Sequence, residues 1–205
     1  MMTKQLSYLA LGDSYTIGEA VEQSASFPHQ LVALLKEKGL EVSEPKVIAT
    51  TGWTTDELKA AIEQEKINET FDLVTLLIGV NNQYRGYSPE VYKKEFTELL
   101  EMAIGFAKGE QQRVYVVSIP DWGVTEFAQQ SGRNQQTISE EIDVFNEINK
   151  QITVSKQVSY LDITPASREA VNDNSLIAKD GLHPSEKMYQ QWAQRLAASI
   201  KLPSK

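Results

Sequence analysis

Ser14 and His183 are the residues whose types and positions best suit chemistry in this sequence. Ser14 directly follows a short apolar run at residues 6–11 and a glycine-aspartate pair. A serine on the turn after a strand is held by rigid backbone with its hydroxyl free, as a nucleophile requires. The same position suits a serine that caps the next segment, so this stretch alone leaves both interpretations open.

A serine hydroxyl needs a base, and the chain offers only two histidines, His29 and His183. His29 belongs to an early predicted helix, which favours a structural role. His183 precedes Pro184, which disfavours helical geometry, and Asp180 stands three residues before it. A turn of this length lets the carboxylate reach imidazole Nδ1 and leaves Nε2 for the serine. The alternative interpretation is a surface turn that ends at the helix cap Ser185.

Gly52 and Asn81 are candidate donors for the negative oxygen that develops in acyl transfer. Asn81 follows the most apolar run of the chain, and its side-chain amide carries two N–H donors. Gly52 follows another predicted strand, where a glycine lets a backbone N–H approach a ligand closely. Turn chemistry explains either residue singly. The order of serine, glycine, asparagine and Asp-x-x-His, each at a strand end or before the last helix, favours acyl transfer.

The elements that must position these residues alternate between strand and helix. Short apolar runs predict strands at 6–11, 47–49, 71–78, 113–119 and 158–163. Helical spacing and capping residues predict helices that begin near Ser26, Thr54, Ser88, Ile138 and Ser185. This order predicts an α/β fold with a five-stranded parallel sheet wrapped by helices on both faces. Ligands of such sheets bind beyond the carboxyl ends of the strands, so the candidate residues are expected at one edge.

Composition limits the alternatives. The 205 residues suit one domain over 1–205, and the hydrophobic content of 41 % supports a substantial core. The net charge of −8 argues against nucleic acid and anionic membranes as partners. No apolar run approaches the ~20 residues of a membrane span. Because Met1–Gln5 contains no signal-type segment, we expect a cytoplasmic protein. The absence of cysteine excludes disulfides and thiolate metal sites.

Four short motifs together resemble the GDSL, or SGNH, hydrolase family of esterases and lipases, over about residues 6–200. They are Gly12-Asp13-Ser14, Gly52, Gly79-Val80-Asn81 and Asp180-Gly181-Leu182-His183-Pro184. The resemblance implies a three-layer α/β/α sandwich of flavodoxin-like topology that hydrolyses carboxylic esters of small molecules without a metal or other cofactor.

The resemblance also implies a role for each matched residue. Ser14 is then the nucleophile, His183 the general base and later the general acid, and Asp180 the group that orients the histidine. The backbone amides of Ser14 and Gly52 and the Asn81 side chain would form the oxyanion hole.

The chain departs from the family pattern at two positions that flank these motifs. Tyr15 stands where the family has leucine, and Asn82 where it usually has aspartate. Loops 80–87, 120–137 and 164–179 are expected to border the pocket. Candidate pocket residues are Asp13, Tyr15, Trp53, Asn82, Tyr84, Arg85, Trp122 and Phe127. Arg85 would suit an anionic substrate group or plain solvation, and the aromatic residues would equally suit packing beneath the loops.

Two other functions stay open at this point. A metal-dependent phosphoesterase would use Asp13, Asn81, Asp180 and His183 as ligands, although one histidine and dispersed carboxylates suit it poorly. A flavodoxin-like binding module would hold a phosphate or nucleotide, although the chain lacks a glycine-rich phosphate loop. For an ester hydrolase, the sequence leaves acyl length, the alcohol and the oligomeric state open.

Overall fold

The structure is a computed structural model and describes residues 5–201. The two ends of the expected 1–205 domain, and most of the N-terminal stretch behind the localisation prediction, lie outside these residues. No helix between residues 5 and 201 combines the length and the apolar character needed to cross a bilayer.

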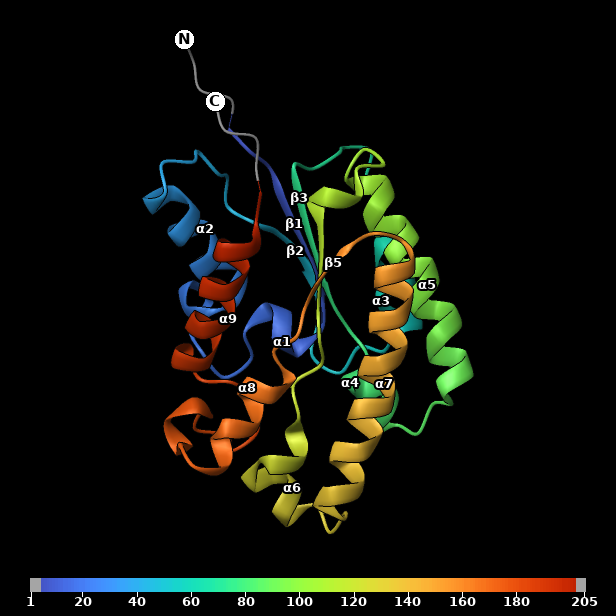
Figure 1. The fold of residues 1–205 in the computed structure, drawn as a ribbon, viewed down its shortest axis with the longest axis vertical. Coiled ribbons are helices and arrows are strands. Elements are labelled where there is room, and N and C mark those ends of the chain that lie inside the picture. The colour runs from blue at the N-terminus through green and yellow to red at the C-terminus, as the bar shows by residue number, and fades with distance from the viewer. Residues whose placement is uncertain (1–4, 202–205) are drawn as a thin grey trace.

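A five-stranded parallel sheet forms the centre of the fold, with the strand order β2-β1-β3-β4-β5 (Figure 1). The strands are β1 (Tyr8–Gly12), β2 (Lys46–Ala49), β3 (Leu73–Leu77), β4 (Val114–Val117) and β5 (Ser159–Leu161). The order reverses between β1 and β3, and a crevice at that reversal is where open α/β sheets bind ligands. The predicted fold class and topology are confirmed.

Burial follows the position of each strand in the sheet. Every residue of β1, β3 and β4 is buried, because neighbouring strands flank them and helices cover both faces. The edge strands β2 and β5 are partly exposed. The near-continuous apolar run that predicted a central strand at 71–78 therefore reflects real burial on both faces.

Helices form a layer on each face of the sheet. Figure 1 shows α2 (Phe27–Glu37) and α9 (Glu186–Ser199) together on one face. On the other face lie α3 (Thr55–Glu65), α5 (Pro89–Phe106) and α7 (Gln135–Ser155). This arrangement is the expected three-layer α/β/α sandwich.

The predicted helix starts at Ser26, Thr54, Ser88 and Ser185 are confirmed, although the Ser26 side chain makes no capping hydrogen bond. Ser88 and Ser185 each accept a backbone N–H of the first turn that follows. Thr54 begins α3 with a capping box, in which the Glu57 carboxylate accepts the Thr54 N–H at 3.0 Å. Helix α7 begins three residues before the predicted Ile138, because Asn134 caps it.

The three stretches predicted as loops contain short helices instead. They are α4 (Val80–Tyr84), η3 (Trp122–Val124), α6 (Glu126–Gln130), α8 (Thr164–Arg168), η4 (Glu169–Val171) and η5 (Asn174–Leu176). Each spans at most five residues, which is too short to show a helical period. They gather with α1 (Ser14–Ile17) toward the carboxyl ends of the strands (Figure 1). The predicted long helices cover the two faces of the sheet, whereas the short helices lie around the carboxyl ends of its strands.

Candidate active site

Ser14 is the first residue of α1, and the single residue Asp13 separates it from the end of β1 at Gly12. The Asp13 carboxylate Oδ1 accepts the Tyr15 N–H at 3.0 Å and caps the helix. Gly12 makes the sharp exit from the strand possible, since a Cβ there would lie 2.1 Å from Thr16 Oγ1. The first N–H groups of a helix have no partner within it, so the Ser14 N–H, at the first position of α1, has no acceptor in this helix.

A chain of hydrogen bonds joins Ser14, His183 and Asp180. His183 Nε2 lies 3.1 Å from Ser14 Oγ, and His183 Nδ1 lies 2.6 Å from Asp180 Oδ2. When Nδ1 carries the proton and donates it to Asp180, Nε2 is left to accept the Ser14 hydroxyl hydrogen. Ser14 and His183 are both buried, at 5 % and 8 % exposure. The structure thus brings together the three residues that the sequence singled out.

The turn before Pro184 fixes the Asp180 carboxylate as an anion. Partial burial disfavours its charge, but hydrogen bonds from the His183 ring and from the Leu182 and His183 backbone N–H groups outweigh burial. Together they hold the pKa of Asp180 below its ordinary value. A carboxylate that stays ionised can stabilise an imidazolium beside it, so this arrangement suits transfer of a proton from Ser14 to His183.

Hydrogen bonds join α4, which contains Asn81, to the loop after β2, which contains Gly52. Asn81 Nδ2 donates to the Trp53 carbonyl at 2.9 Å, and Arg85 donates to the Gly52 carbonyl at 2.6 Å. Gly52 has a φ of +86°, a left-handed conformation that favours glycine. An amide has two hydrogens, so one Asn81 donor holds the loop in place and the other remains for a ligand.

The pocket at Ser14 has a volume of about 170 Å³ and mostly apolar walls. Among the predicted residues, Tyr15, Tyr84, Trp122 and Phe127 line it. Val80 and Leu182 line it as well, although the prediction did not include them. Both belong to the motifs Gly79-Val80-Asn81 and Asp180-Gly181-Leu182-His183-Pro184, so their positions beside Asn81 and His183 are the sequence signal that could have identified them. A cavity this small and apolar suits a short hydrocarbon group.

The other predicted pocket residues lie outside this lining. Asn82 is fully buried and exchanges two hydrogen bonds with Thr55, at 3.1 and 2.6 Å, so it joins α4 to α3. Arg85 pairs with Glu57 at 3.1 Å, besides its bond to the Gly52 carbonyl. Trp53 is partly buried against the core and supplies the carbonyl that Asn81 binds.

Asp13 precedes Ser14 in the chain but does not line the pocket. It is fully buried, and its second oxygen, Oδ2, has no hydrogen-bond partner among the described residues. Burial raises the pKa of Asp13 to about 7, against the lowering effect of the Tyr15 N–H. Burial and the Asp13 charge also raise the pKa of Tyr15, whose ring meets the His183 ring edge to face at 5.8 Å.

Arg133 supports the aromatic wall and was absent from the prediction. Its guanidinium lies 5.8 Å from the Tyr84 ring centre and 5.4 Å from that of Trp122, and it pairs with Glu141 at 3.1 Å. Gln83 fixes Trp122 from below by accepting its indole N–H at 2.8 Å. No local pattern marks an arginine in a polar stretch as the partner of two aromatic rings.

Metal ligands were one alternative for these residues. Across residues 5–201, no three His, Asp or Glu side chains gather in a group that could hold a metal ion. Asp180 and His183 direct their polar atoms to each other and to Ser14.

The sequence matches the model of the family described as the GDSL-like lipase/acylhydrolase family over residues 10–191. The search of curated proteins found no match to this sequence. Solved structures with the same fold include a lipase/acylhydrolase from Enterococcus faecalis, with a TM-score of 0.75 and 18 % identity over 96 % of this chain and 95 % of that one. The acetylxylan esterase Axe2 from Geobacillus stearothermophilus gives a TM-score of 0.74 and 20 % identity over 99 % and 98 %.

Proposed function

The chain belongs to the GDSL-like lipase/acylhydrolase family, and we propose that it hydrolyses carboxylic esters with Ser14 as the nucleophile. The observation that carries the proposal is the hydrogen-bonded chain from Ser14 Oγ to His183 and on to Asp180. A serine so placed has a base for its proton, and the base has an anion that fixes its tautomer.

In the proposed reaction, His183 Nε2 takes the Ser14 proton as Oγ attacks the ester carbonyl carbon. The tetrahedral intermediate collapses, the alcohol oxygen leaves with the proton from Nε2, and the acyl group stays on Oγ. Water then attacks this acyl-enzyme while Nε2 takes a proton from it. Collapse of the second intermediate releases the carboxylic acid and returns the proton to Ser14 Oγ. Asp180 stabilises the imidazolium in both steps.

The oxyanion of each intermediate is proposed to bind the Ser14 N–H, the Gly52 N–H and the second Asn81 amide hydrogen. The position of Ser14 at a helix start and the anchoring of Asn81 on Trp53 support this assignment. Donors held in place before the reaction stabilise the developing charge, and removal of one such donor costs about 10²–10³ in kcat.

The acyl group is proposed to be short. The pocket of about 170 Å³ is lined by Tyr15, Val80 and Trp122, among others, which leaves room for little more than a small hydrocarbon group. The fold match to an acetylxylan esterase agrees with a small acyl group.

The direct test is labelling with a fluorophosphonate probe, which reacts with activated serines, followed by mass mapping of the adduct. We expect a single adduct on Ser14 in the wild type, none in Ser14→Ala, and an unchanged adduct in the control Ser131→Ala, which alters an exposed serine. Hydrolysis of 4-nitrophenyl acetate should fall by at least about 10³ in Ser14→Ala.

Two results would replace the proposal with another function. A folded wild type that takes no label, hydrolyses no ester and binds a nucleotide would favour a binding module. Hydrolysis of a phosphoester that a chelator abolishes would favour a metal-dependent enzyme.

A further inference from the structure

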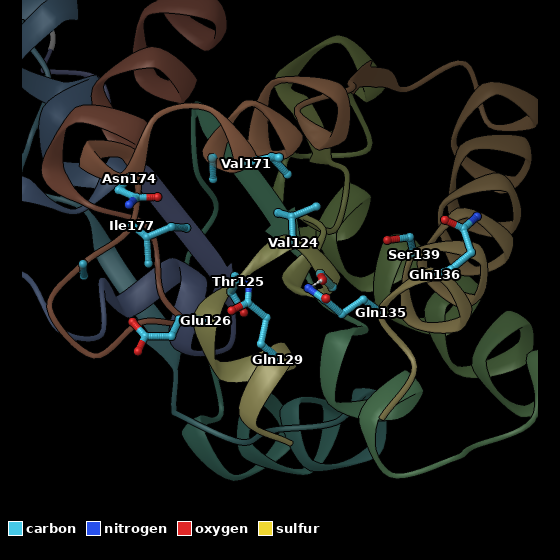
Figure 2. A pocket seen from close by; sticks show the side chains of 13 residues that line it. Val124, Thr125, Glu126, Gln129, Gln135, Gln136, Ser139, Val171, Asn174 and Ile177 are labelled. Carbon is cyan, nitrogen blue, oxygen red and sulfur yellow. Dashed lines mark hydrogen bonds between the residues drawn. The ribbon is translucent and has the colours of Figure 1, made fainter. Parts of the chain in front are cut away.

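A second cavity of about 650 Å³ lies beside the Ser14 pocket and is almost four times larger. Three segments enclose it: residues 123–129, the first turns of α7, and residues 170–178 (Figure 2). Its volume lies within the 300–1,000 Å³ typical of sites for small molecules, whereas the Ser14 pocket lies below that range. The proposed acylation chemistry makes no use of this second cavity.

The second cavity and the Ser14 pocket have no lining residue in common, but neighbouring residues line them. Phe127 lines the Ser14 pocket, and its neighbour Glu126 lines the second cavity. The Phe127 N–H donates to the Gly181 carbonyl at 3.0 Å, and Glu126 packs against Gly181 closely enough that a Cβ there would lie 3.4 Å away. A second link joins Ala178, which lines the second cavity, to His183, which lines the Ser14 pocket: the Ala178 N–H donates to the His183 carbonyl at 2.8 Å. Because Glu126 and Phe127 are adjacent, a ligand portion that extends from Ser14 past Phe127 would next meet Glu126, at the edge of the second cavity.

The lining is rich in neutral groups that both donate and accept hydrogen bonds. Amide side chains come from Gln129, Gln135, Gln136 and Asn174, and a hydroxyl from Ser139 (Figure 2). Thr125 also lines the cavity, but its hydroxyl donates to the Trp122 carbonyl and accepts the Ala128 N–H. Gln135 is held by its bond to the Gly123 carbonyl at 2.7 Å, in which Nε2 donates, so its Oε1 is presented as an acceptor.

Charge argues against an anionic ligand in the second cavity. Its one charged lining residue is the carboxylate of Glu126, and within the described part of the chain no Lys, Arg or His lines it. Apolar side chains, among them Val124, Val171 and Ile177, also line the second cavity. Mixed amide, hydroxyl and apolar surfaces complement a sugar ring, which has hydroxyls at its edge and C–H groups on its faces.

The floor of the second cavity is rigid, as a binding site requires. Asp121 is buried, accepts the Gly123 N–H at 2.8 Å and pairs with Arg168 at 2.8 Å. Gly123 packs so tightly on α7 that a Cβ would lie 2.8 Å from the Gln135 carbonyl. The start of α7 and the 122–124 turn therefore keep a fixed spacing beneath the amides.

We propose that the second cavity binds a neutral sugar unit on the alcohol side of the ester. This inference rests on the proposed function, in which the small pocket holds the acyl group, and it places the alcohol portion of the ester beyond Phe127. The substrate class is then a short-chain ester of a neutral oligosaccharide. The reaction releases a small carboxylic acid and leaves the saccharide with a free hydroxyl.

The first experiment measures binding apart from turnover. Ser14→Ala protein is titrated with xylotriose, cellotriose and chitotriose at millimolar concentration and followed by ligand-observed NMR. We expect at least one trisaccharide to bind. Adding Gln129→Ala and Gln136→Ala should weaken that binding about tenfold, as expected for the loss of one or two hydrogen bonds.

Gln151→Ala is the matched control. Gln136 and Gln151 both lie on α7, and each donates to a glutamate four residues away, Glu140 or Glu147, but only Gln136 lines the second cavity. The control should bind the trisaccharide as Ser14→Ala alone does. Circular dichroism checks that every variant is folded.

The second experiment measures kinetics with Ser14 intact. The Gln129→Ala/Gln136→Ala variant should show KM raised about tenfold for the acetylated form of the bound trisaccharide and unchanged kinetics for 4-nitrophenyl acetate. Absence of trisaccharide binding, or equal binding by the double variant and the Gln151→Ala control, overturns the inference even if esters are hydrolysed. Trisaccharide binding without any ester hydrolysis keeps the sugar site and overturns the proposed function instead.

Discussion

Asp180 holds both the backbone and the ring of His183. Its Oδ1 accepts the His183 backbone N–H at 3.0 Å, while its Oδ2 lies 2.6 Å from the His183 ring Nδ1. One carboxylate therefore fixes the turn and the direction of the imidazole together. The Leu182 N–H, also 3.0 Å from Oδ1, completes the arrangement.

Replacing Asp180 with Asn should remove activity while leaving the turn formed. The amide oxygen can still accept the two backbone N–H groups, but the amide nitrogen would face His183 Nδ1 and favour the wrong tautomer. We expect kcat for a small acetyl ester to fall by about 10³–10⁴, with a thermal midpoint close to wild type. Asp173→Asn, at a surface carboxylate paired with Lys187, is the control and should keep full activity. An active Asp180→Asn enzyme would remove this residue from the proposed mechanism.

Asp13 should make the protein less stable as the pH rises. Its pKa is about 7 in the folded protein and near 3.8 when solvated, so the folded state binds the proton more tightly. Protonation therefore favours folding, and this contribution is fully present below about pH 4 and is lost as the pH rises through 7. The difference corresponds to about 4 kcal/mol.

The comparison of wild type with Asp13→Asn isolates this effect, because other groups titrate equally in both. Urea unfolding at about pH 4 and about pH 8 should show that the variant gains stability relative to wild type at the higher pH. Parallel stability curves for the two proteins would mean that Asp13 does not carry the proton.

Arg133 should affect substrate binding more than turnover. Arg133→Ala removes the cation that lies over Tyr84 and Trp122 and frees Glu141. We expect KM for a small ester to rise about two- to fivefold with kcat nearly unchanged, and stability to fall by about 1 kcal/mol. Arg195→Ala, on the exposed face of α9, should change neither value. An unchanged KM in Arg133→Ala would show that the aromatic wall holds its position without the arginine.

Gly79 and Gly105 should respond to alanine in opposite directions. Gly79 has a φ of +133°, and a Cβ there would lie 2.6 Å from the Tyr92 ring, so Gly79→Ala should cost about 3 kcal/mol or more. Gly105 lies in α5 with open space around its Cα, so Gly105→Ala should add about 0.5–1 kcal/mol. Denaturant unfolding measures both, and equal effects would contradict the strain assigned to Gly79.

The sequence predicted those parts of the fold whose signal repeats along the chain. The run 71–78 is apolar because β3 is covered on both faces, and the start of α3 is marked by the Thr54 and Glu57 capping box. The turn that contains His183 could also be predicted, since Asp180 and Gly181 favour turns and Pro184 disfavours helical geometry at the residue before it.

The remaining features depend on contacts between distant segments. Asn82, a candidate pocket residue that stands where the family usually has aspartate, instead forms hydrogen bonds with Thr55. Nothing in the local sequence distinguishes it from its neighbour Asn81. The contacts of Arg133 with Tyr84 and Trp122, and the lining of the second cavity, likewise arise between segments that are distant in the sequence. Glutamine, asparagine and serine are common in polar loops, so the sequence does not mark them as cavity residues. They line the second cavity because residues 123–129, α7 and residues 170–178 surround it. The catalytic roles of Ser14, Asp180 and His183 stay predictions until the labelling experiment.

The hydrogen bond between Ser14 and His183 joins residues 169 positions apart. During synthesis on the ribosome, the strand that precedes Ser14 emerges long before the turn with His183. A nascent chain therefore has this serine without its proposed base until that turn has been made. Activity and reactivity toward the fluorophosphonate should thus appear together, only after the turn with His183 has emerged and folded against Ser14.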